Sequence, residues 1–164
     1  MKMLSILEAV GEFERLALGF AAAQHDALDD AAKIVQGRAK QIIGHYQTET
    51  GPFDQWSPLA ASTVQEKERL GYAPPDNPLK RTGEMQASIE RSADAERAYV
   101  GSDEDKALWQ EMGTHGPGVG SSGYHVPPRS FLGAAAFQLE DKVAEIVTEA
   151  AVAQIAGVSR KAIR

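Results

Sequence analysis

The four histidines are the side chains in this sequence best suited to chemistry near neutral pH. His25 and Asp29 stand four positions apart in a predicted helix, a spacing that would place two metal ligands on one face. No third ligand accompanies them, and helix surfaces often carry such pairs by chance. His115 and His125 flank a glycine-rich segment and would meet if it folded back. We predict instead that they are loop residues or contacts made in an assembly, so we expect no metal site.

Other patterns that could carry chemistry lack essential parts. The run Gly116-Pro117-Gly118-Val119-Gly120 has the composition of a phosphate loop, but it lacks the Lys-Ser/Thr pair and the strand-to-helix context. No serine lies in a nucleophile-elbow pattern. The absence of cysteine excludes a thiol nucleophile, a thiolate zinc site and disulfides. Asp103-Glu104-Asp105 is more simply a solvated loop that caps the next turn than a cation site. We therefore predict no catalytic residue, no cofactor and no enzyme activity.

The overall charge argues against direct binding of nucleic acid. The chain of 164 residues has a net charge of −6 and a pI near 5.2, whereas phosphate binding is usually driven by a basic face. The basic C-terminal residues Arg160, Lys161 and Arg164 more simply complement a helix dipole. An acidic surface would suit a channel that DNA passes without sticking. No run of about 18 apolar residues is present, so we expect no membrane span. The N-terminus makes a poor signal peptide, which favours a cytoplasmic site of synthesis.

Two helical patterns fill the N-terminal part. Ser5 and Glu8 match a capping box. Two apolar stripes with helical spacing follow, Ile6, Val10, Phe13, Ala17 and Phe20, then Leu28, Ala32, Val35, Ala39, Ile42 and Tyr46. The sequence leaves open whether the helices join through residues 21–23 or bend there. Thr50-Gly51-Pro52 is expected to end the helical region.

Short elements are predicted in the middle of the chain. Trp56 and Leu59 would hold a short helix of about residues 60–70. The three prolines of segment 73–78 exclude a helix or a central strand there. Thr82 or Gly83 would then cap one helical turn whose Met85 and Ile89 point inward. A hairpin follows, with alternation over 89–93, a turn at 94–96 and a return over 97–101.

The last helix is predicted from about Ser130 to Ala156, and Gly157 would end it. Its apolar stripe is Leu132, Ala136, Leu139, Val143, Ile146, Ala150 and Ala153. The predicted fold is α+β, with N-terminal and long C-terminal helices packed on a small antiparallel sheet and a Gly-rich extended loop. We expect one domain, 1–164, made of N-terminal helices (1–49), a motif region with the sheet and loop (50–133), the C-terminal helix (130–156) and a basic tail (157–164).

The Gly-rich loop follows a short apolar turn that carries Leu108, Trp109 and Met112. Ordering glycine costs the most backbone entropy, so we expect something outside the subunit to hold this loop. The predicted inter-subunit loop residues are Gly113, His115, Gly116, Pro117, Gly118, Val119, Gly120, Gly123 and Tyr124. The predicted anchors, in the core or at an interface, are Trp56, Leu59, Trp109, Pro127, Pro128, Arg129 and Phe131.

The order of short motifs in the middle of the chain is informative. The motifs are Trp56-Ser57-Pro58-Leu59, Thr63 and Lys67, Pro78-Leu79, Thr82-Gly83, Ser88-Ile89, Val100-Gly101-Ser102, Leu108-Trp109-Gln110-Glu111-Met112-Gly113-Thr114 and Val126-Pro127-Pro128-Arg129-Ser130-Phe131-Leu132. In this order, residues 53–133 resemble the tail-completion or virion-morphogenesis proteins of tailed bacteriophages, also described as minor tail components. The slot of Leu108-Trp109 more often holds tyrosine-alanine in that family, and the position of Ser130 is commonly proline.

This resemblance implies a structural protein of the virion, without cofactor or catalytic residue. It implies a subunit of a homo-oligomeric ring, expected to be a hexamer, at the head–tail junction or the head-proximal end of the tail. Such a ring contacts other neck and tail proteins and surrounds a channel through which DNA passes without specific binding. Assembly would take place in the bacterial cytoplasm. Two alternatives stay open, a metal-dependent hydrolase that uses His25, Asp29 or the loop histidines, and a small dimeric binding module.

Overall fold

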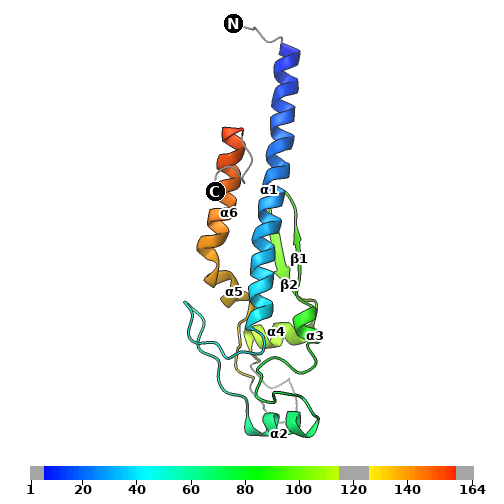
Figure 1. The fold of residues 1–164 in the computed structure, drawn as a ribbon, viewed down its shortest axis with the longest axis vertical. Coiled ribbons are helices and arrows are strands. Elements are labelled where there is room, and N and C mark those ends of the chain that lie inside the picture. The colour runs from blue at the N-terminus through cyan, green and yellow to red at the C-terminus, as the bar shows by residue number, and fades with distance from the viewer. Residues whose placement is uncertain (1–5, 115–125, 158–164) are drawn as a thin grey trace. The chain divides into compact units, whose positions relative to one another are not determined.

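The computed structural model of the protein describes residues 6–114 and 126–157 (Figure 1). These residues form six helices and a two-stranded antiparallel sheet, which confirms the predicted α+β class. The elements are α1 (Ile6–Ile42), α2 (Ala61–Arg69), α3 (Glu84–Ala87), β1 (Glu90–Ala93), β2 (Ala98–Gly101), α4 (Asp105–Met112), α5 (Leu132–Gln138) and α6 (Glu140–Ala156). Within the described ranges no helix combines the length and the apolar character that crossing a bilayer requires. Ser5 and the basic residues Arg160, Lys161 and Arg164 lie outside them.

Helix α1 is continuous, which answers the question that the sequence left open at residues 21–23. The prediction that the helical region ends at Thr50-Gly51-Pro52 is wrong, because α1 stops at Ile42. Gly44 follows with a φ of 97°, a left-handed conformation that glycine adopts readily and that commonly ends helices. The backbone N–H of Gly44 then donates to the carbonyl of Pro78 at 2.9 Å, so the chain leaves the helix direction here.

The single C-terminal helix predicted from Ser130 to Ala156 is in fact two helices. Leu139, with φ −112° and ψ 8°, separates α5 from α6. The predicted stripe holds in α6, where Ile146 and Ala150 are buried, but not in α5, where Ala136 is exposed. The break lies within two residues of the boundary between two compact units, so α5 and nearly all of α6 belong to different units.

The chain divides into two compact units. The first, here called the helical unit, contains the described residues of Met1–Ala32, Ser92–Tyr99 and Asp141–Arg164. The second, the motif unit, contains the described residues of Lys33–Arg91 and Val100–Glu140. All described members of the ordered motifs between residues 53 and 133 fall in the motif unit. The single domain 1–164 stays a prediction.

In the helical unit, α1 and α6 face each other through small side chains. Ala27 of α1 and Ala150 of α6 are both buried, and they line the same small cavity of about 60 Å³. The hairpin turn at residues 94–96 forms as predicted. The Asp94 carboxylate accepts the backbone N–H groups of Glu96 and Arg97, each at 2.7 Å.

The motif unit has a core built from segments that are far apart in the sequence. Its buried members are Ala39, Ile42, Ile43, Trp56, Ile89, Ala107, Phe131, Ala134 and Ala135. The predicted anchors Trp56 and Phe131 therefore pack in the core, and Ile89 points inward as predicted, with Met85 packed against the cluster. Helix α2 matches the helix predicted at about 60–70. Gly83, with a φ of 92°, begins α3.

Candidate functional site

Helix α4 exposes most of its large apolar side chains. Leu108, Trp109 and Met112 are 61%, 46% and 66% exposed, while Ala107 on the opposite side is buried. Trp109 is predicted as an anchor in the core or at an interface, and its exposure excludes the core of the motif unit. We call these three residues the α4 apolar face. Contiguous exposed apolar side chains of this size are typical of contact surfaces.

Glu111 ties α4 to the beginning of α5. Its carboxylate accepts the backbone N–H groups of Phe131 at 2.7 Å, Leu132 at 2.9 Å and Gly133 at 2.8 Å, and the Ser130 hydroxyl also donates to it. The first N–H groups of a helix have no partner within the helix, and a carboxylate there also complements the helix dipole. One side chain therefore fixes α4, and with it the α4 apolar face, to the 130–133 segment.

The two ends of the Gly-rich loop pair with each other. The Thr114 N–H donates to the Val126 carbonyl at 3.0 Å, and the Val126 N–H donates to the Thr114 hydroxyl at 3.1 Å. Gly113 has a φ of 72°, and a Cβ there would lie 2.9 Å from the backbone of Val126 and Pro128. Gly113 therefore closes the base of the loop. The other predicted loop residues lie outside the described part of the chain: His115, Gly116, Pro117, Gly118, Val119, Gly120, Gly123 and Tyr124.

Arg129 is buried although it carries a charge. Only 6% of its surface is exposed, and burial lowers the pKa of its guanidinium, which nonetheless stays protonated near neutral pH. Its Nη2 donates to the carbonyl of Ser57 at 3.0 Å, and its backbone N–H donates to the carbonyl of Gln110 at 2.6 Å. Arg129 therefore links two of the sequence motifs. Its Nε has no hydrogen-bond partner among the described residues.

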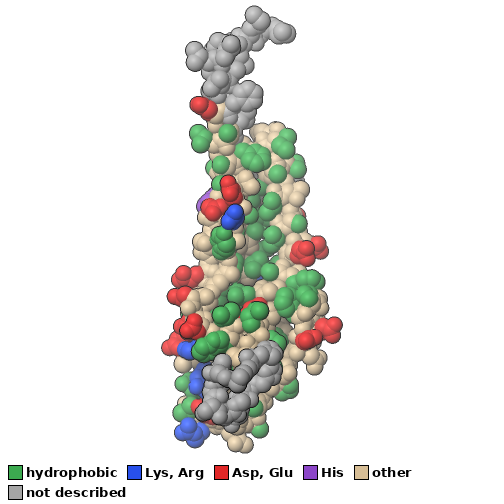
Figure 2. Space-filling view, turned by 180° about the vertical axis from the view of Figure 1, so that it is seen from behind, with side chains coloured by type: hydrophobic (Ala, Val, Ile, Leu, Met, Phe, Trp, Pro, Cys, Tyr) green, Lys and Arg blue, Asp and Glu red, His purple; other side chains and the backbone are tan. Residues whose placement is uncertain are grey.

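A cavity of about 760 Å³ in the motif unit brings many of these residues together. Five of its lining side chains are cationic, Lys67, Lys80, Arg81, Lys106 and Arg129, and among the described residues only Glu84 contributes a carboxylate. We call it the basic cavity. In Figure 2 most of the visible Lys and Arg side chains gather towards the lower end, whereas Asp and Glu side chains are spread over the face. The net charge of −6 therefore conceals a local concentration of positive charge.

Four of the seven predicted anchors line the basic cavity, Leu59, Trp109, Pro127 and Arg129. Pro128, by contrast, is exposed. The sequence pattern identifies Lys67 only as a member of a motif and does not predict its burial. In the structure Lys67 is 3% exposed, and its Nζ donates to the carbonyl of Asn77 at 2.7 Å. Burial lowers the pKa of Lys67, and the nearby Arg81 charge adds to this effect.

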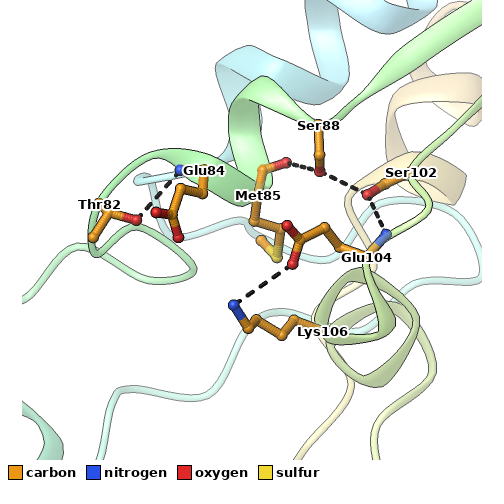
Figure 3. Close-up of polar contacts among 7 residues, drawn as sticks. All are labelled: Thr82, Glu84, Met85, Ser88, Ser102, Glu104 and Lys106. Atoms are coloured by element: carbon orange, nitrogen blue, oxygen red, sulfur yellow. Dashed lines mark hydrogen bonds and ion pairs between the residues drawn. The ribbon is translucent and has the colours of Figure 1, made fainter.

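One wall of the basic cavity is held by a chain of polar contacts (Figure 3). The hydroxyls of Ser88 and Ser102 lie 2.7 Å apart, and the Ser102 hydroxyl accepts the backbone N–H of Glu104 at 3.1 Å. Glu104 in turn pairs with Lys106 at 3.5 Å. These contacts connect the end of α3 to the beginning of α4. The 103–105 segment leads into α4, with Glu104 at the N-cap position and Asp105 as the first helical residue, but no side chain of the segment caps the helix by a hydrogen bond.

His25, one of the two residues of the predicted ligand pair, contacts the carboxylate that follows it in the sequence. The Nδ1 of His25 lies 3.4 Å from a carboxylate oxygen of Asp26, its sequence neighbour. Among the residues that the structure describes, no group of three or more His, Cys, Asp or Glu side chains could hold a metal ion. His115 and His125 lie outside that part of the chain.

Comparisons with known proteins leave the site to be interpreted from its own geometry. The chain matches no family model, no curated protein and no solved structure.

Proposed function

We propose that this protein is a structural subunit of the neck or tail of a bacteriophage or a related particle. In this proposal it acts without catalysis or cofactor, as a homo-oligomeric ring, expected to be a hexamer, that completes the tail or joins it to the head. DNA passes through the ring without specific binding, and other neck and tail proteins are its partners. The motif order over residues 53–133 supports the particle class, and the α4 apolar face supports assembly as the mode of action.

The α4 apolar face is the observation on which the proposal mainly rests. Aromatic residues and methionine are enriched at protein interfaces, and Trp109 and Met112 stand exposed on a helix that Glu111 fixes in place. A fixed contact helix loses little conformational freedom when a neighbour binds. The Gly-rich loop begins directly after this helix, so loop and face together would form one side of a subunit contact.

A double variant of the α4 apolar face tests self-assembly. Leu108→Ser with Met112→Ser removes two exposed apolar side chains, and Ile155→Ser, at 82% exposure in the helical unit, is the matched control. Analytical ultracentrifugation and native mass spectrometry should find a closed oligomer for the wild type and the control, and a monomer for the double variant with an unchanged circular dichroism spectrum. A wild-type protein that stays a dimer or monomer, also when mixed with the products of neighbouring genes, would contradict the ring.

The particle class is tested separately by the neighbouring reading frames. A portal, major capsid or tail-tube gene beside this one supports a neck or tail protein. A neighbourhood of metabolic genes without any of these would overturn the assignment, whatever the oligomeric state.

A further inference from the structure

The basic cavity is lined by five cationic side chains, two of them buried, and assembly into a ring does not by itself require such a cavity. Two of its cations, Arg81 and Lys106, already have carboxylate partners, Glu66 at 3.4 Å and Glu104 at 3.5 Å. Both pairs are partly exposed, and such pairs contribute little stability, so a ligand carboxylate can take the place of either partner at small cost. The two deeper cations, Lys67 and Arg129, donate to backbone carbonyls.

Burying a cation is unfavourable unless an opposite charge or several hydrogen bonds compensate for the lost water. Arg129 is 94% buried, yet its Nε–H donates to no atom of the described chain. Gln110, which also lines the basic cavity, has a buried side-chain oxygen that accepts no hydrogen bond from the residues that the structure describes. Both atoms are enclosed by protein, so a ligand in the cavity reaches the exposed Lys80, Arg81 and Lys106 instead.

We infer that the basic cavity binds an acidic peptide segment of a partner protein. The carboxylates of that segment pair with the exposed Lys80, Arg81 and Lys106. The buried charges of Lys67 and Arg129 add to the positive potential of the lining. Apolar side chains of the segment contact Leu59, Met85 and Trp109, which line the same cavity.

Two observations favour a peptide over other anions. The volume of about 760 Å³ lies within the range of cavities that hold drug-sized ligands, far more than one phosphate needs. The phosphates of duplex DNA lie on a wide rod, which fits poorly into a concave site whose deeper cations are more than nine-tenths buried.

This inference adds to the proposed function the chemical class of one partner, an acidic peptide segment. That the partner is another neck or tail protein rests on the proposed function. The binding itself can be measured without a ring. Trp109 lines the basic cavity and Trp56 is buried in the core, so tryptophan fluorescence of the full chain reports on the cavity.

The experiment compares two pools of synthetic hexapeptides. In the first pool Asp or Glu alternates with apolar residues, and in the second Asn or Gln replaces every acid. We expect saturable fluorescence changes with the acidic pool and binding at least about tenfold weaker with the amide pool. Equal responses to both pools, or no response to either, would overturn the inference. Stronger binding of a 20-base-pair duplex would do so too, as would saturation by inorganic phosphate that abolishes peptide binding at equal concentration.

Charge-removing variants test whether the acidic peptides bind in the basic cavity. Lys80→Gln with Lys106→Gln removes two charges that the core does not need, and we expect binding of the acidic pool to weaken about fivefold, in line with the modest strength of exposed ion pairs. Lys142→Gln, on α6 outside the cavity, is the matched control and should bind like the wild type. Unchanged binding in the double variant would exclude this cavity. If peptide binding fails while the α4 variant still abolishes the oligomer, only this inference falls.

Discussion

The carboxylate of Glu111 accepts the backbone N–H of Phe131 at 2.7 Å, across 20 residues of sequence. This contact joins the two motifs that flank the Gly-rich loop. It places the exposed side of α4 and the buried Arg129 in one rigid frame, because Arg129 lies two residues before Phe131 and donates to the carbonyl of Gln110. The α4 apolar face and the basic cavity therefore depend on the same few hydrogen bonds.

Replacing Glu111 by glutamine should destabilise the protein. The amide keeps one accepting oxygen but turns an N–H₂ group towards backbone donors that then lose their partner, so we expect a loss of about 2–3 kcal/mol in the free energy of unfolding. Urea denaturation followed by circular dichroism measures it. Glu68→Gln on the exposed side of α2 is the control and should change little. A Glu111 variant as stable as this control would mean that the capping of α5 contributes nothing.

Two helical glycines should respond to alanine in opposite directions. At Gly133 a Cβ would lie 2.6 Å from the ring of Phe53, which is itself packed edge-on against Phe137, so we expect a destabilisation of about 1–3 kcal/mol. At Gly37 nothing lies within 4 Å, and alanine should stabilise α1 by about 0.5–1 kcal/mol. Thermal unfolding of the two single variants measures both effects. Similar stability of both variants would show that Phe53 moves aside freely.

The carboxylate of Asp94 in the hairpin turn should make the stability of the protein depend on pH. Hydrogen bonds from the N–H groups of Glu96 and Arg97 lower the pKa of Asp94 below its ordinary value of 3.8. A lowered folded-state pKa means that the carboxylate stabilises the fold above pH 3.8, and that this contribution disappears as the pH falls through the lower value.

Asp94→Ala should therefore be less stable than the wild type at neutral pH, with a difference that shrinks at about pH 2.5. Urea denaturation at both pH values measures the difference, and Asp54→Ala, at another exposed carboxylate, is the comparison. A deficit of the same size at both pH values would show that the charge of Asp94 is not the cause.

Local patterns predicted the elements whose signals lie within a few neighbouring residues. The turn at 94–96, the short helix α2 and the glycine that begins α3 were all readable in this way. The end of α1 was not, because Tyr46 continues the apolar spacing past Ile42. In the structure the Tyr46 hydroxyl donates to Asp76 at 2.6 Å, outside any helix.

The missed parts of the site depend on contacts between distant residues. The residues around Glu111 contain no signal that its hydrogen-bond partners lie about 20 positions later in the sequence. Likewise, the residues around Lys67 and Lys106 contain no signal that these two lysines line one cavity. The break at Leu139 is of the same kind, because the apolar spacing of the sequence continues from Leu132 to Ala153 and no local signal marks the change of backbone conformation at Leu139. Net charge, an average over the whole chain, could not reveal cations that fold together.

Substitution of the two tryptophans should affect two different properties, the stability of the fold for Trp56 and self-association for Trp109. Trp56 is 4% exposed in the core of the motif unit, and Trp56→Ala should cost about 3–5 kcal/mol in the free energy of unfolding because it leaves a large void. Trp109 is 46% exposed, so Trp109→Ala should change that free energy by less than about 1 kcal/mol while it weakens self-association. Urea denaturation of the monomer and analytical ultracentrifugation measure the two quantities independently. A Trp109 variant that unfolds early but assembles normally when folded would show that this side chain serves the fold of its own subunit, and the α4 apolar face would lose its assigned role.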